Sequence, residues 1–128
     1  MKNRDLLNIL NTLPKNYSLN YLFKHDEFDL SYHLCAFPFT ISYNKESNTV
    51  HISNKRGKYT SILLIGDLIK VLKDTDPNAD VVFETYINVG KDSETLITVD
   101  EYYIKMSEIN DDPKGKYVTI HIIGCLNI

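Results

Sequence analysis

The chain has 128 residues, of which 43% are hydrophobic and 24% charged, and its formal net charge is −3. This composition is too apolar for a disordered chain and is sufficient for one modest hydrophobic core. No apolar run approaches the roughly 20 residues needed to cross a bilayer, and only two cysteines are present, so we expect a single compact cytoplasmic domain. The negative charge argues against direct nucleic-acid binding, which needs a basic surface to displace counterions.

The first half of the chain predicts one helix followed by strands. Leu6, Leu10 and Leu13 recur at helical spacing, Asn3 is the expected N-cap, and Pro14 is the expected stop. The residues after Pro14 are rich in aromatic and β-branched types, which favour strands. The predicted strands are Tyr17–Lys24, Phe28–Ala36, Phe39–Asn44 and Thr49–Ser53.

The second half predicts the same scheme. Leu64–Lys73 is the expected helix, because aliphatic residues recur on one side of it and Asp67 in its first turn suits the positive end of the helix dipole. The predicted strands are Asp80–Val89, Thr95–Met106 and Lys116–Ile123.

Short sequence patterns recur in the two halves in the same order. Asp5–Leu10, Pro14 and Thr49–Ile52 reappear as Asp67–Leu72, Pro77 and Thr119–Ile122, with an offset that grows from 62 to 70 residues. Loop insertions in one of two copies would produce this drift. We therefore predict an α+β protein made of two tandem α-β-β-β(-β) copies, residues 1–54 and 60–128, joined by residues 55–59. The copies are expected to form a pseudo-two-fold antiparallel sheet system with two helices, either as one joined sheet or as two sheets packed face to face.

The second copy also resembles a widespread group of small phage and bacterial helix-plus-hairpin proteins of unestablished function. Residues 67–73, 76–83 and 118–122 carry the resemblance, which covers residues 64–123 and more faintly residues 3–53. It implies a phage, prophage or mobile-element setting, where small acidic proteins bind and block a host component. It brings no catalytic residues with it.

Charge differs between the two halves and points to a candidate binding surface. Residues 1–61 hold eight Lys or Arg against five Asp or Glu, whereas residues 62–128 hold six against twelve. Tyrosine is a frequent interface anchor, because it buries much area for little rotamer entropy. The expected partner-binding residues are the acidic and tyrosine side chains Glu84, Tyr86, Asp100, Glu101, Tyr102 and Tyr103. We expect a non-catalytic inhibitor with a basic protein partner, either an anti-defence protein such as an anti-CRISPR or an immunity-type protein.

Two alternatives stay open. His51 and His121 hold the same place in the repeated pattern, so a two-fold arrangement that brought them together would give a ligand- or metal-dependent protein. A structural or oligomeric phage component, including a homodimer, would use exposed sheet edges. No nucleophile, base or phosphate-binding glycine pattern is arranged for catalysis, so we expect no enzyme, no cofactor and no resident metal.

Overall fold

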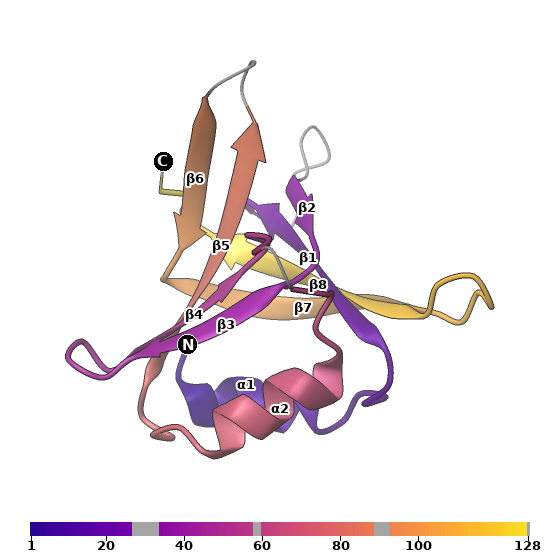
Figure 1. Ribbon diagram of the computed structural model, residues 1–128, viewed down its shortest axis with the longest axis horizontal. Coiled ribbons are helices and arrows are strands. Elements are labelled where there is room, and N and C mark those ends of the chain that lie inside the picture. The colour runs from indigo at the N-terminus through magenta and orange to yellow at the C-terminus, as the bar shows by residue number, and fades with distance from the viewer. Residues whose placement is uncertain (27–33, 58–59, 89–92, 128) are drawn as a thin grey trace.

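The computed structural model describes residues 1–26, 34–57, 60–88 and 93–127, and within them each half of the chain supplies one helix followed by four strands (Figure 1). The helices are α1 (Asn3–Leu10) and α2 (Ile65–Lys73). The strands are β1 (Ser18–Lys24), β2 (Leu34–Ala36), β3 (Thr40–Asn44), β4 (Thr49–Ser53), β5 (Asp80–Asn88), β6 (Glu94–Val99), β7 (Tyr102–Asn110) and β8 (Tyr117–Gly124). The predicted α+β class with two helices is confirmed. Residues 28–33, 58–59 and 89 of the predicted strands and join lie outside the described residues.

The strands form two four-stranded sheets, and each sheet takes two strands from each half. The orders are β2-β1-β8-β7 and β3-β4-β5-β6. The outer pairs in both sheets are antiparallel, but the central pairs, β1 with β8 and β4 with β5, are parallel. The sheets therefore differ from the wholly antiparallel system that we expected. Each half splits its two antiparallel pairs between the sheets, so the central neighbours come from different halves and run in the same direction.

A constant shift of 62 residues relates the backbone contacts that join the halves. The hydrogen bond from Asn3 N to Ala79 O (2.8 Å) corresponds to that from Ile65 N to Tyr17 O (2.8 Å). The hydrogen bond from Arg4 N to Pro77 O (3.1 Å) corresponds to that from Gly66 N to Lys15 O (2.8 Å). The isolated β-bridge between Lys2 and Asp80 likewise corresponds to the bridge between Leu64 and Ser18. We call these regions the α1 junction (residues 2–4 with 77–80) and the α2 junction (residues 64–66 with 15–18). In both, the chain entering the first strand of one half holds the first turn of the other half's helix. Tandem duplication as the origin of this symmetry stays a prediction.

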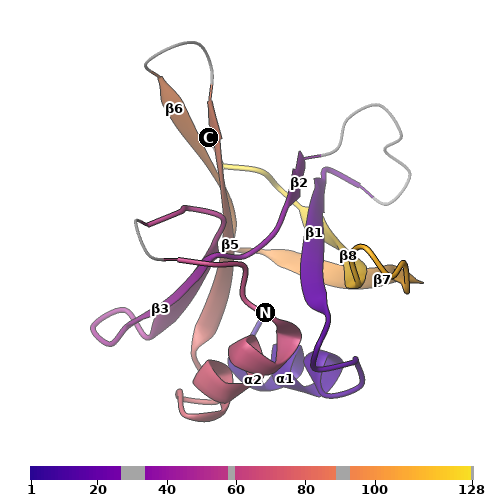
Figure 2. The ribbon, with the colours of Figure 1, turned by 45° about the vertical axis from the view of Figure 1, so that its right-hand side comes forward.

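One core lies between the two sheets and the helix pair. Figure 2 shows β1 and β5 on opposite sides of it, with both helices closing one end. Tyr21 on β1 and Phe83 on β5 meet there with ring centroids 5.2 Å apart. The Tyr21 hydroxyl donates a hydrogen bond to the Glu84 carbonyl oxygen (2.7 Å), and burial raises its pKa well above the usual value. The phenol therefore stays neutral inside the core.

Asn3 has a different role from the predicted N-cap. It lies within α1, is fully buried, and turns its side-chain amide toward the end of α2. Its Nδ2 donates to the carbonyl oxygens of Leu72 (2.8 Å), Thr75 (3.3 Å) and Asp76 (3.1 Å). The last carbonyls of a helix have no partner within the helix, so a donor from elsewhere stabilises them. Asn3 thus caps the other helix, a contact that depends on tertiary structure.

The predicted strand Thr95–Met106 is in fact two strands. β6 ends at Val99 and β7 begins at Tyr102, and the two belong to different sheets. Asp100 and Glu101 form the bend between them. Gly124 on β8 allows this bend to pass closely, because a Cβ at that position would lie 2.3 Å from the Glu101 carbonyl oxygen.

Candidate functional site

A surface hollow of about 520 Å³ lies where the α1 junction meets the bend between β6 and β7. We call it the acidic hollow, because three carboxylates contribute to it. Its lining residues are Met1, Thr49, Asp80, Val82, Asp100, Glu101 and Tyr102. Strands β4 and β5 form one side, since Thr49 and Asp80 are register partners in their parallel pair.

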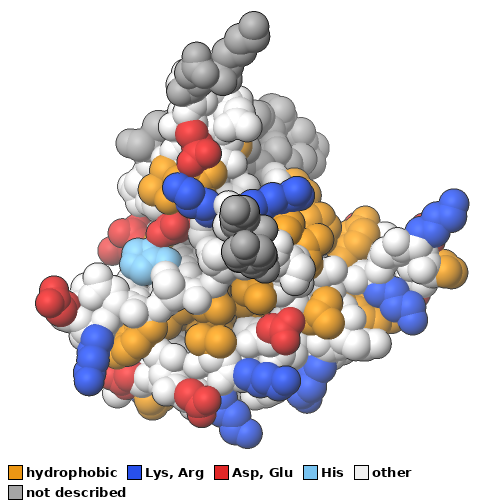
Figure 3. Space-filling view, in the orientation of Figure 1, with side chains coloured by type: hydrophobic (Ala, Val, Ile, Leu, Met, Phe, Trp, Pro, Cys, Tyr) orange, Lys and Arg blue, Asp and Glu red, His pale blue; other side chains and the backbone are white. Residues whose placement is uncertain are grey.

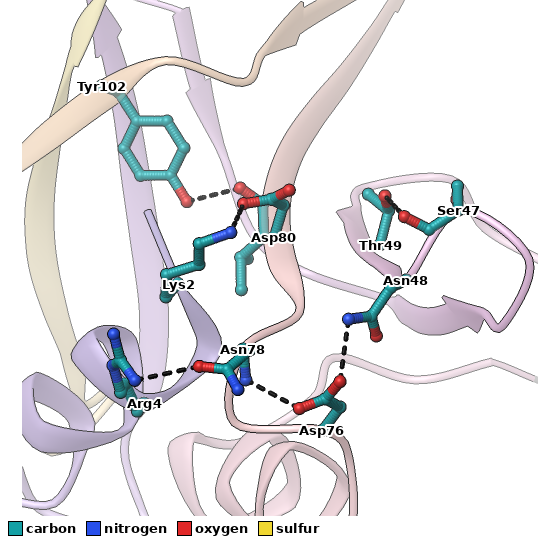
Figure 4. Close-up of polar contacts among 10 residues, drawn as sticks. Lys2, Arg4, Ser47, Asn48, Thr49, Asp76, Asn78, Asp80 and Tyr102 are labelled. Carbon is teal, nitrogen blue, oxygen red and sulfur yellow. Dashed lines mark hydrogen bonds and ion pairs between the residues drawn. The ribbon is translucent and has the colours of Figure 1, made fainter.

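The Asp80 side of the hollow is anchored by an ion pair. Lys2 Nζ lies 2.8 Å from Asp80 Oδ1 (Figure 4), and the two side chains are 45% and 58% exposed. Water screens such an exposed pair, so its contribution to folding is small. Lys2 therefore places a cation beside the Asp80 carboxylate, and both side chains stay accessible to water.

A polar network stiffens the α1 junction beside the hollow. Asp76 accepts hydrogen bonds from the backbone N–H of Asn78 (2.9 Å) and from Asn48 Nδ2 (2.8 Å), and Arg4 Nη1 donates to Asn78 Oδ1 (2.9 Å) (Figure 4). The Asn78 N–H, followed by the Asn48 amide, lowers the pKa of Asp76. The turn that leads into β5 is therefore stabilised by a hydrogen bond from α1, by one from the turn between β3 and β4, and by one within the turn itself.

Tyr102 forms a rigid wall of the hollow. Its hydroxyl donates to the Val81 carbonyl oxygen (2.8 Å), and its ring meets Phe83 edge-on with centroids 5.6 Å apart. Burial, and to a lesser degree the negative charge of Asp80, raises the pKa of Tyr102 far above its usual value. The residue is a neutral, fixed phenol.

The opposite side of the hollow consists of exposed carboxylates on a fixed backbone. Asp100 and Glu101 are both exposed, and Asp100 Oδ1 accepts a hydrogen bond from Asn127 Nδ2 (3.2 Å). The backbones of Thr98 and Asn127 exchange two hydrogen bonds of 2.9 Å each. The same bend packs closely against Gly124 on β8, where a Cβ would lie 2.3 Å from the Glu101 carbonyl oxygen. The carboxylates therefore project from a backbone whose position is already set.

The structure divides the six predicted binding residues into three locations. Asp100, Glu101 and Tyr102 meet in the acidic hollow. Glu84 and Tyr86 lie further along β5, on the face of the sheet that points away from the core. Tyr103 lies on β7 in the other sheet and is 50% exposed.

Glu84 and Tyr86 already have partners within the protein. Glu84 Oε1 lies 2.5 Å from His51 Nδ1, and the Glu84 side chain is only 14% exposed. The Lys55 ammonium lies 4.7 Å from the centroid of the Tyr86 ring, and Asn54 binds the Tyr86 backbone. These two residues are therefore less free to contact a partner than Asp100 and Glu101.

Sequence reasoning missed the contribution of Asp80, Lys2 and Thr49. The sequence predicts Asp80 as the start of a strand and does not indicate its ion pair to Lys2, because the two residues are 78 positions apart. The repeated offset of 62 between Asp5 and Asp67 was the available signal, since the same shift relates the two junctions.

His51 and His121 do not come together as the metal-site alternative requires. They lie in different sheets, on β4 and β8. His51 pairs in register with Val82 on β5, and His121 pairs with Leu22 on β1. Under the shift of 62, Leu22 corresponds to Glu84, which lies two residues beyond Val82. The two histidines therefore do not occupy equivalent positions in the symmetric arrangement. Across the described part of the chain, no three His, Cys, Asp or Glu side chains are grouped so that they could hold a metal ion.

Comparisons of this chain with protein-family models, with curated proteins and with solved structures find no match. Within residues that the structure describes, neither helix has the length and apolar character needed to cross a membrane.

Proposed function

We propose that this protein is a small non-catalytic protein-binding protein that inhibits a partner with a basic surface through the acidic hollow. The setting that we propose is the host cytoplasm and a phage or mobile element, with a role as an anti-defence protein, such as an anti-CRISPR, or as an immunity-type protein. The acidic second half of the chain and the resemblance of residues 64–123 support this setting.

The observation that carries the proposal is the arrangement of Asp100 and Glu101 beside Asp80 and the fixed Tyr102 ring. A lysine or arginine side chain from a partner would enter between carboxylates and lay its aliphatic part against Tyr102. Carboxylates pair strongly with arginine because two parallel N–H···O bonds can form. Because the bend is held by Asn127 and by the passage over Gly124, little ordering is required on binding.

The proposal is tested by affinity capture from a lysate of the native host with the wild-type protein and two variants. Asp100→Asn combined with Glu101→Gln removes charge with little change in shape. Glu108→Gln on β7 is the matched control, because Glu108 is an exposed carboxylate outside the hollow. We expect wild type and Glu108→Gln to retain the same basic protein, identified by mass spectrometry, and the double variant to lose it. Equal capture by the double variant would contradict the proposal.

Binding kinetics with the purified partner give a second readout. Exposed interfacial charges act mainly on the association rate and its salt dependence. The double variant should therefore associate more slowly at low salt, and the difference from wild type should shrink as salt is added. Equal association rates of the double variant and wild type at low salt would contradict attraction of the basic partner by Asp100 and Glu101.

The edge strand β7 has two features that argue against assembly of the protein into a larger structure through this edge. A bulge interrupts this strand between Met106 and Glu108, and Lys105 lies on it. Bulges and lysines at sheet edges hinder pairing with further strands. We therefore propose partner binding as the function.

A further inference from the structure

A second hollow, of about 440 Å³, lies at the α2 junction. We call it the lysine hollow. Its lining residues are Lys15, Asn16, Leu64, Gly66, Asp67, Ile69, Lys70 and Lys73. None of them contributes to the acidic hollow.

Gly66 lets α2 lie close to the chain before β1 at the floor of the lysine hollow, because residue 66 has no side chain. The Gly66 N–H donates to the Lys15 carbonyl oxygen (2.8 Å), and a Cβ at Gly66 would lie 3.0 Å from that oxygen. The helix and the chain before β1 therefore touch backbone to backbone. Leu64, which is 38% exposed, supplies aliphatic surface beside this contact, and Ile69, which is only 8% exposed, adds a small part of it.

The equivalent place at the α1 junction is covered. Arg4 is the counterpart of Gly66 under the shift of 62, and its guanidinium donates to Asn78 Oδ1 (2.9 Å). Lys2 replaces Leu64 there and pairs with Asp80. The same backbone arrangement is thus closed by cations at one junction and left open to an aliphatic floor at the other.

The rim of the lysine hollow carries a net positive charge, because three lysines line the hollow together with a single carboxylate, Asp67. Lys15, Lys70 and Lys73 are exposed, and none forms an ion pair with another described residue. The Asp67 carboxylate is engaged by the Leu64 N–H (2.8 Å) at the start of α2. Lys70 and Lys73 suit the negative end of the helix dipole, which explains their place on α2 but not the exposed aliphatic floor between them and Lys15. Figure 3 shows Lys and Arg side chains over the helix pair beside hydrophobic side chains.

We propose that the lysine hollow binds a short acidic segment of a partner protein, in which one aliphatic side chain is flanked by carboxylates. The aliphatic side chain would contact Leu64 and Ile69 above Gly66. The flanking carboxylates would reach Lys15 on one side and Lys70 with Lys73 on the other. The charge of the rim selects the acidic partner, and the apolar floor selects the anchor residue. This binding goes beyond the proposed function of the acidic hollow and does not depend on it.

The test uses a capped peptide with one leucine between pairs of glutamates, titrated into the isotope-labelled full-length protein. Backbone amide NMR signals of Lys15, Leu64, Gly66 and Ile69 should shift in a saturable manner. Two control peptides, one with glycine in place of leucine and one with lysines in place of glutamates, should not produce these shifts. Absence of saturable shifts with the leucine peptide up to the millimolar range would overturn the proposal.

Two variants distinguish the floor from the rim. Lys70→Gln combined with Lys73→Gln changes only exposed side chains and should weaken peptide binding about threefold to tenfold, as expected for the loss of two exposed ion pairs. Gly66→Arg should cover the floor as Arg4 does at the α1 junction and abolish binding. Unchanged affinity in the lysine double variant would overturn the proposal even if Gly66→Arg failed to fold.

A second copy of this protein is the competing occupant, and sedimentation distinguishes it. Self-association of wild type that disappears in the Lys70→Gln, Lys73→Gln variant would place another copy in the lysine hollow and contradict the proposal. A wild-type monomer that binds the peptide would support it.

Discussion

The α1 and α2 junctions have the same backbone and different surfaces. In both, two helical N–H groups donate to the chain that enters a strand of the other half. Lys2 and Arg4 cover the α1 junction, whereas Leu64 and Gly66 leave the α2 junction open. Features present at both junctions follow from folding. Features present at only one are candidates for function, and both hollows are of this kind.

The largest expected effect tests whether the two halves are equivalent in the core. Leu10 and Leu72 are counterparts, and both are fully buried. An aspartate at either position would bury an unpaired charge and remove more than about 3 kcal/mol from a total stability on the order of 5–15 kcal/mol. We expect Leu10→Asp and Leu72→Asp each to lower the midpoint of the thermal transition, followed by circular dichroism, by at least about 10 °C or to abolish the transition. A midpoint equal to that of wild type in one variant would show that the two positions are not equivalent in the core.

The second-largest effect is expected at a position where the two halves carry different residues. Asn3 caps the end of α2, whereas its counterpart Ile65 is buried as an apolar residue. Asn3→Asp would point a carboxylate at carbonyl oxygens and should lower the free energy of unfolding by about 3 kcal/mol. Asn8→Asp, on the exposed side of α1, is the control and should change it little. Urea denaturation of both variants measures the difference, and equal midpoints would argue against the cap.

A smaller effect links the acidic bend to its support. Gly124→Ala places a Cβ 2.3 Å from the Glu101 carbonyl oxygen, so the bend must move, at a cost of about 2 kcal/mol. Gly115→Ala is the matched control, because a Cβ there meets nothing within 4 Å. We expect only Gly124→Ala to lower the melting temperature and weaken capture of the basic partner. If both variants behave alike, the bend is not held by this contact.

The smallest effect is expected from a substitution that makes the α1 junction resemble the α2 junction. Lys2→Leu installs the residue that the α2 junction carries and removes the exposed ion pair with Asp80. The loss should be at most about 1 kcal/mol at low salt and should vanish at high salt. Chemical denaturation at two salt concentrations checks this. A loss that persists at high salt would mean that Lys2 packs against the protein through its aliphatic chain.

Local sequence patterns were sufficient for the helices and for most strands. Leucine spacing placed α1 and α2, and β-branched runs placed β1, β3, β4 and β8 within a residue or two. The sheet partners depend on contacts that no local pattern records, and so does the break at Asp100 and Glu101, where the chain changes sheets. The acidic character of the second half was readable from composition. The acidic hollow was not, because it needs the parallel pair of β4 with β5 to place Thr49 beside Asp80.

The exchange of strands between halves also sets when the protein can fold during synthesis. Asn20 on β1 and Thr119 on β8 are hydrogen-bonded across 99 residues of sequence, and β8 occupies the interior of its sheet. A nascent chain therefore cannot complete either central parallel pair from its first half alone. Long-range strand pairing of this kind folds slowly, so the newly made first half must wait on or near the ribosome with its apolar strand faces unpaired.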